Sequence, residues 1–66
     1  MPNSIEELVE MIAKRDNISY NEALACVRDA ALDMEHAFYN GRLDEAEDIL
    51  RESLSLEPDY LDLFIF

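Results

Sequence analysis

Residues 19–41, SYNEALACVRDAALDMEHAFYNG, decide the fold, because they describe one long helix with a signal at each end. Ser19 and Glu22 have the Ser-x-x-Glu spacing of a capping box, in which each side chain accepts a hydrogen bond from a backbone N–H at a helix start. No Gly or Pro interrupts the segment until Asn40-Gly41, where a left-handed residue can close the helix. The segment therefore predicts a central helix over about residues 19–39.

Apolar residues occupy most of this helix when it is wrapped at 100° per residue. The broad apolar arc comprises Ala23, Leu24, Cys26, Val27, Ala30, Ala31, Met34, Ala37 and Phe38. Cys26 is thus predicted to be a small buried hydrophobic residue and not a nucleophile. Ala25, Leu32 and Tyr39 recur every seven residues on the opposite, polar strip, among Arg28, Glu35 and His36. This repeat predicts contacts on a second side of the helix.

Shorter helices are expected on both sides of the central one. A second Ser-x-x-Glu sequence at residues 4–7 starts a helix over about 4–15, with apolar residues at i, i+3, i+4 and i+7. Asp44 is expected to cap a third helix over about 44–56. Pro58 suits the first position of a helical turn over about 58–65. The fold class predicted is all-α: a small three-helix bundle with a C-terminal helical turn, in one domain over residues 1–66.

Charge restricts the kinds of partner. Sixteen Asp and Glu face five Lys and Arg, for a net charge of -11. Self-repulsion on this scale disfavours direct contact with nucleic acid and with anionic membranes, and it favours a basic protein. The third helix is expected to present an acidic partner-binding face. Its members are Asp44, Glu45, Glu47, Asp48 and Glu52.

Other functional classes find little support in the sequence. The single glycine excludes a glycine-rich phosphate loop, and Asp33 with His36 supplies only one of the pairs that a two-metal bundle requires. We therefore expect no catalytic residue, no metal and no cofactor, and the protein is not predicted to be an enzyme. A single cysteine excludes an internal disulfide, and no apolar run approaches the ~20 residues of a membrane span, so we expect a cytoplasmic protein.

The chain also has more large apolar residues than three short helices can cover. Those assigned to an apolar interface are Leu32, Tyr39, Tyr60, Phe64 and Phe66. Burial of this surplus predicts a homodimer or a higher oligomer, because small domains often complete their core by association.

Two resemblances accompany these patterns. Gly41, Glu45-Ala46 and Pro58 match the turn glycine, the Glu-Ala pair and the closing proline in the second half of a tetratricopeptide repeat, so residues 41–58 resemble that half. Asp33, in the preceding helix, stands where the repeat has leucine. A single unit of this type implies a helical hairpin, since about three repeats are needed for a peptide-binding superhelix.

Over most of its length the chain resembles small acidic helical proteins of phages and mobile elements. The shared features are the Ile-Ser-Tyr-x-Glu-Ala helix start over residues 18–23 and an ending over residues 49–60, in which Ile-Leu and a further leucine precede Leu-Glu-Pro-Asp-Tyr. This group carries no assigned activity.

The functional hypothesis is therefore a small acidic module that docks a basic protein. A phage-type inhibitor, or a DNA mimic acting on a nucleic-acid-binding protein, would be of this kind. The alternatives are a structural homo-oligomer without a specific ligand and a single-hairpin peptide-binding module.

Overall fold

The computed structural model describes residues 2–65, which form three α-helices and one 3-10 helix. The elements are α1 (Ile5–Asp16), α2 (Tyr20–Tyr39), α3 (Leu43–Leu54) and the 3-10 helix η1 (Pro58–Leu63). No strand occurs in this part of the chain. The prediction of an all-α three-helix bundle with a C-terminal helical turn is confirmed.

The first two helices begin at side-chain caps. The Ser19 hydroxyl accepts a hydrogen bond from the Glu22 N–H at 3.1 Å, and the Glu22 carboxylate accepts one from the Ser19 N–H at 3.4 Å. At α1, the Ser4 hydroxyl accepts from the Glu7 N–H at 3.2 Å, while the Glu7 carboxylate accepts from the N–H of Asn3 at 2.9 Å. Both helices start within one residue of the predicted position.

The start of α3 differs from the prediction, in which Asp44 was the cap. Arg42 occupies the capping position and makes no side-chain capping hydrogen bond. The Arg42 N–H instead donates to the Ala37 carbonyl at 2.9 Å, so the same residue closes α2 and leads directly into α3. Asp44 lies in the first turn of α3, where its negative charge interacts favourably with the helix dipole.

A residue in the left-handed region follows each of the three α-helices. Gly41 has φ 68°, whereas Asn17 and Ser55 both have φ 55°. Only glycine adopts such angles without steric cost, so Asn17 and Ser55 hold a less favourable conformation. The left-handed Ser55 also explains why α3 ends at Leu54 and does not continue to residue 56 as predicted.

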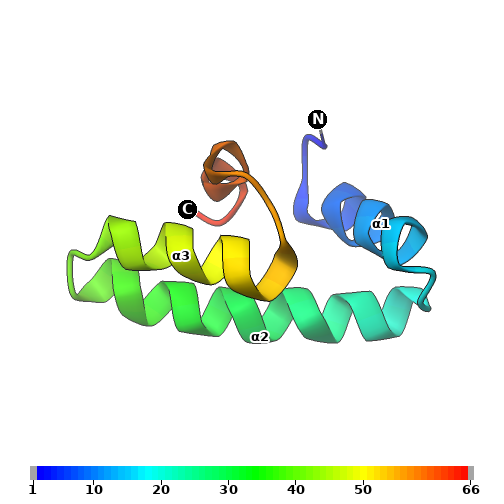
Figure 1. The fold of residues 1–66 in the computed structure, drawn as a ribbon, viewed down its shortest axis with the longest axis horizontal. Coiled ribbons are helices and arrows are strands. Elements are labelled where there is room, and N and C mark those ends of the chain that lie inside the picture. Colours follow the sequence, from blue (N-terminus) through cyan, green and yellow to red (C-terminus); the bar gives the residue numbers. More distant parts are fainter. Residues whose placement is uncertain (1, 66) are drawn as a thin grey trace.

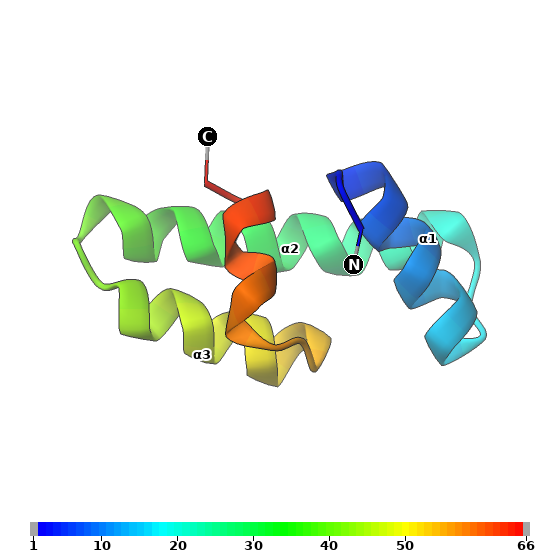
Figure 2. The same cartoon turned by 90° about the horizontal axis from the view of Figure 1, so that it is seen from above.

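The central helix α2 forms the spine of the molecule (Figure 1). α1 packs against the first part of α2, α3 packs against the second part, and η1 packs against α3. Figure 2 shows the same arrangement from above, with α3 beside α2 and η1 crossing over them. Because these elements gather on one side of α2, the other side of the helix has no partner within residues 2–65.

The core lies where α1, α3 and η1 meet α2. α2 contributes residues spaced by four and three, the expected pattern for a helix that buries one face. The buried apolar residues are Leu8, Val9, Ile12, Ala23, Val27, Ala30, Met34, Ala37, Ala46, Leu50, Leu54, Leu56, Leu61 and Phe64. No charged or polar residue is buried in the described part of the chain.

The C-terminal segment returns to the bundle. Leu56, Leu61 and Phe64 are buried in the core, and Tyr60 is half-buried. The Tyr60 hydroxyl lies 3.9 Å from the Sδ of Met11, which links η1 to α1. This segment therefore completes the core up to Phe64.

The helices are too short or too polar for a bilayer. α2 is the longest at 20 residues, but it carries Glu22, Arg28 and several further charges. Among residues 2–65, no helix has both the length and the apolar character that would let it cross a membrane.

Candidate interaction surfaces

The outer face of α3 is acidic because the opposite face of the helix is buried. Ala46, Leu50 and Leu54 recur every four residues and face the core. At 100° per residue, the far side of the helix then carries four exposed carboxylates. We call these residues the α3 acidic face: Asp44, Glu45, Asp48 and Glu52.

Two of these four carboxylates form ion pairs within the chain. Arg42 lies 3.5 Å from Glu45, and Arg51 pairs with Asp48, both at the i, i+3 spacing. Asp44 and Glu52 form no ion pair with any residue between 2 and 65. Exposed pairs of this kind contribute little to stability, so their arginines can exchange partners readily.

Glu47 does not belong to this face, although the sequence grouped it with the other four. It is half-buried, whereas its neighbour Asp48 is exposed. A helical step of one residue turns the side chain by 100°, and this places Glu47 at the edge of the surface that packs inward.

A further ion pair lies far from α3 in the sequence. At the end of α1, Arg15 donates two hydrogen bonds to the carboxylate of Asp16, at 2.8 and 3.0 Å. This hydrogen bonding lowers the pKa of Asp16 below its ordinary value. Three ion pairs thus occur within residues 2–65 of a chain that has sixteen Asp and Glu, and the surface stays strongly negative.

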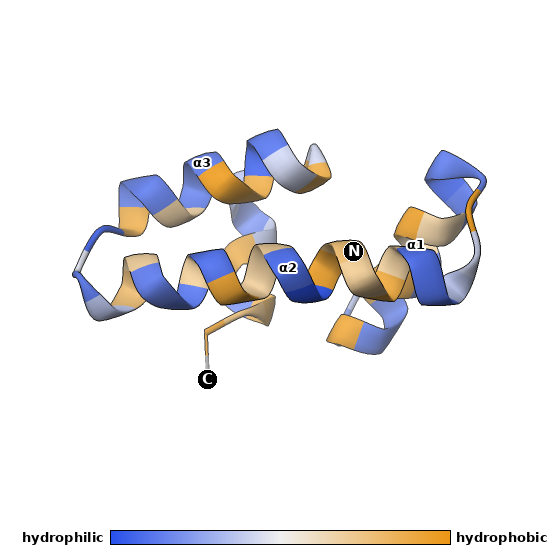
Figure 3. Ribbon diagram, turned by 90° about the horizontal axis from the view of Figure 1, so that it is seen from below, coloured by the Kyte–Doolittle hydropathy of each residue, from blue (hydrophilic) through white to orange (hydrophobic). Residues whose placement is uncertain are grey.

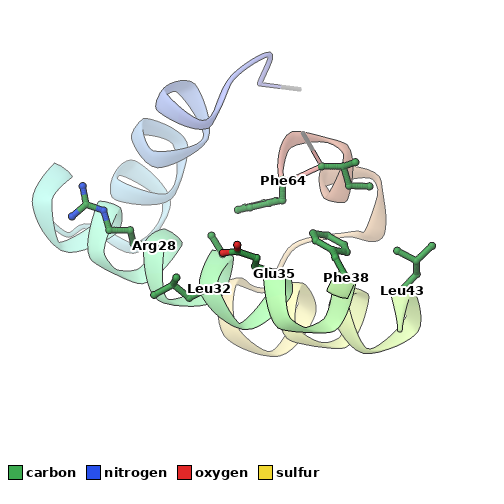
Figure 4. Close-up of a pocket in the computed structure, with 8 residues that line it drawn as sticks. Arg28, Leu32, Glu35, Phe38, Leu43 and Phe64 are labelled. Carbon is green, nitrogen blue, oxygen red and sulfur yellow. The ribbon is translucent and has the colours of Figure 1, made fainter. Parts of the chain in front are cut away.

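A second candidate surface is an apolar groove of about 730 Å³ between α2 and the C-terminal segment. Figure 4 shows Phe64 on the side of the C-terminal segment, facing Glu35 and Phe38 of α2, with Arg28 and Leu43 toward opposite ends. The full lining is Arg28, Ala31, Leu32, Glu35, Phe38, Leu43, Phe64 and Ile65. The groove combines an apolar wall with one positive and one negative side chain.

The residues predicted for an apolar interface fall into different environments. Leu32 and Tyr39 are exposed, at 57% and 84% of their surface. Tyr60 is half-buried, and Phe64 retains only 4% exposure, so Phe64 belongs to the core and contributes one wall of the groove. Phe66 lies outside the described residues.

Six of the eight groove residues were not among those predicted for the apolar interface: Arg28, Ala31, Glu35, Phe38, Leu43 and Ile65. Leu43 and Ile65 expose 54% and 51% of their surface. Leu43 is the first residue of α3 and directly precedes Asp44 and Glu45, which gives a weak local signal for an outward leucine. Ile65 has no such signal, because its position depends on how the tail packs.

The side chains considered for chemistry are not assembled into a site. Cys26 was predicted to be buried, but it is exposed, because α1 and α3 cover a narrower arc of α2 than the apolar pattern suggested. Asp33 and His36 are also exposed. Within residues 2–65 there is no group of three or more His, Cys, Asp or Glu side chains arranged to hold a metal ion.

Comparisons with known proteins do not assign the chain to a family. No protein-family model matches it, and neither the curated proteins nor the solved structures include a significant match.

Proposed function

We propose that the protein is a small acidic binding module that docks a basic protein on the α3 acidic face. The observation that carries this proposal is the alignment of four exposed carboxylates on one side of a twelve-residue helix, of which Asp44 and Glu52 have no cationic partner in residues 2–65. The net charge of -11 adds a long-range field that draws a basic surface toward the module.

The spacing of these carboxylates suits a basic helix. Asp44, Asp48 and Glu52 are four residues apart, so each lies about 6 Å further along the helix axis than the one before it. A partner helix with Lys or Arg at every fourth position has the same spacing. Each of its basic side chains would pair with one of these three carboxylates, and the one that pairs with Asp48 would displace Arg51.

The charge density of α3 favours a partner with an ordinary basic surface over a protein whose binding site is built for duplex DNA. Twelve residues extend about 18 Å, a length over which duplex DNA carries about ten phosphate charges. α3 carries five carboxylates and one arginine over that length. The helix is therefore acidic enough to attract a basic protein, but it is too dilute in charge to reproduce a DNA backbone.

The test compares two variants with the same net charge. The first carries Asp44→Asn, Glu45→Gln, Asp48→Asn and Glu52→Gln on the α3 acidic face. The matched control carries Glu6→Gln, Glu10→Gln, Asp59→Asn and Asp62→Asn, all at exposed positions on α1 and η1. A protein captured from cell extract on the immobilised wild-type chain is identified, purified and titrated against each variant by calorimetry.

We expect the α3 variant to bind the basic partner about 30-fold more weakly than wild type, since four exposed ion pairs at ~0.5 kcal/mol each amount to ~2 kcal/mol. The control should stay within about threefold. Wild-type affinity should also fall between about 50 and 500 mM salt, where the Debye length shortens from ~13 Å to ~4 Å. Equal losses in both variants, or an affinity indifferent to salt, would contradict the proposal.

A further inference from the structure

Two of the exposed charged residues of α2, Arg28 and Glu35, have apolar neighbours one turn away on the helix surface. Among these neighbours, Leu24, Ala31 and Phe38 are half-buried against the core. All four residues at i±3 and i±4 from Arg28 are apolar: Leu24, Ala25, Ala31 and Leu32. Residues three and four apart are the neighbours that share a helix surface. Asp29, which directly follows Arg28, is the nearest carboxylate on this helix. Arg28 forms no ion pair with any residue from 2 to 65.

Glu35 repeats this arrangement two turns later. Its four neighbours at i±3 and i±4 are also apolar: Ala31, Leu32, Phe38 and Tyr39. Glu35 likewise makes no ion pair with the described chain. We call Arg28, Glu35 and these neighbours the α2 outer patch.

The two charges cannot satisfy each other within one molecule. Seven residues separate them, which is about 10.5 Å along the helix axis, well beyond ion-pair distance. Both side chains are exposed, so each is free to pair with an opposite charge on another molecule.

Apolar exposure is concentrated at the same place. Of the large hydrophobic residues that remain exposed, Leu32 and Tyr39 lie in the α2 outer patch, and Leu43 and Ile65 line the adjoining groove. Figure 3, seen from below, shows hydrophobic positions spread along α2 from end to end. Helices that pack against each other bring apolar residues into contact, and opposite charges across the contact set their orientation.

We infer that the α2 outer patch binds the same patch of a second copy of this chain, with the two α2 helices antiparallel. A two-fold axis between Ala31 and Leu32 places Arg28 of each copy opposite Glu35 of the other, which makes two equivalent ion pairs. A parallel arrangement would instead place like charges opposite each other, which is unfavourable. The charges on the two α2 helices therefore complement each other only when the helices run in opposite directions.

Side-chain size follows the same two-fold relation. About this axis, Ala25 lies opposite Phe38 of the second copy, and Ala31 lies opposite Leu32. Ala25 and Ala31 therefore each meet a larger residue, which lets the two helices approach closely there. Leu24 lies opposite Tyr39, so two large residues meet toward each end of the contact. Charge selects the antiparallel pairing, and the two alanine contacts are compatible with it.

The first experiment exchanges the two charges. Sedimentation equilibrium from about 10 μM to 1 mM should give the wild-type chain twice its mass of 7.6 kDa. Arg28→Glu places like charges opposite each other twice per dimer, so the dissociation constant should rise at least about tenfold. The double variant Arg28→Glu/Glu35→Arg has the wild-type net charge and restores the pair in reverse, so its dissociation constant should return to within about threefold of wild type.

Arg51→Glu is the matched control, because it makes the same charge change at an exposed arginine on α3 and should leave the dimer almost unaffected. Helical circular dichroism shows that each variant remains folded. A wild-type mass of 7.6 kDa at about 1 mM, or a dimer indifferent to Arg28→Glu, would overturn the inference. The inference would also be overturned if the double variant did not regain the wild-type dissociation constant, since Arg28 and Glu35 would then not face each other across an antiparallel pair.

A second experiment tests the orientation. In a Cys26→Ser background, Leu32→Cys places a thiol beside the two-fold axis. Under mild oxidation this thiol should form a disulfide with the thiol at position 32 of the second copy. Tyr39→Cys should not, because two residues 39 lie about 22 Å apart in the antiparallel pair. Faster cross-linking at position 39 than at position 32 would demonstrate a parallel pair.

Pairing of copies and docking of a basic protein are separable. The α3 variant described above should keep the dimer mass, and Arg28→Glu should keep the affinity for the basic partner. Added salt should lower the affinity for the basic partner, because it screens the attraction between opposite charges. It should stabilise the dimer, because it relieves the repulsion between two copies of charge -11.

Discussion

Replacing Leu50 with alanine is expected to lower the free energy of unfolding by about 3 kcal/mol. Leu50 is fully buried at the centre of α3, where it packs into the core against α2. Removing its side chain forfeits the transfer free energy of the lost atoms and leaves a cavity. In a domain of this size the melting temperature should fall by about 12 to 20 °C, measured by circular dichroism.

Leu43→Ala is the control for this experiment, since it makes the same substitution on the same helix at a residue that is 54% exposed. Its effect should stay under about 1 kcal/mol. Equal destabilisation by both substitutions would show that Leu50 is not part of a packed core.

Replacing Phe64 with alanine is also expected to cost about 3 kcal/mol, the lower part of the range for a buried phenylalanine because the residue lies close to the chain end. Phe64 is 4% exposed and closes the core above α2. Urea denaturation followed by circular dichroism measures the loss.

The neighbouring Ile65→Ala removes a side chain that is half exposed, and it should cost less than about 1 kcal/mol. If Phe64→Ala destabilised the protein no more than Ile65→Ala does, the packing of the C-terminal segment would not contribute to the stability of the core.

Local patterns predicted most of the fold. The Ser-x-x-Glu sequences at Ser4 and Ser19 located two helix starts to within one residue, because the interactions that cap a helix lie within four residues. The start of α3 was also predicted to within one residue, but its cap was wrong, because no side chain caps this helix. A backbone hydrogen bond that closes α2 sets the position instead, and no pattern of residue types reports it.

Long-range packing explains what could not be predicted. Cys26 falls on the apolar arc of α2, yet it is exposed because the crossing of α1 and α3 decides how much of that arc is covered. The burial of Phe64 likewise depends on where the tail returns. On the candidate surfaces, helical periodicity placed four of five carboxylates on the α3 acidic face, but it could not show that the tail forms a groove beside α2.

The spine arrangement of α2 also affects how the protein folds. Each of the two main contacts of α2 joins helices that are neighbours in the sequence, so the chain closes only short loops to form them. Topologies of this kind fold quickly, within microseconds to milliseconds. The α2–α3 hairpin with η1 contains most of the core, whereas α1 is anchored chiefly through α2. We therefore expect α1 to be the first part to open when the molecule fluctuates away from its native state.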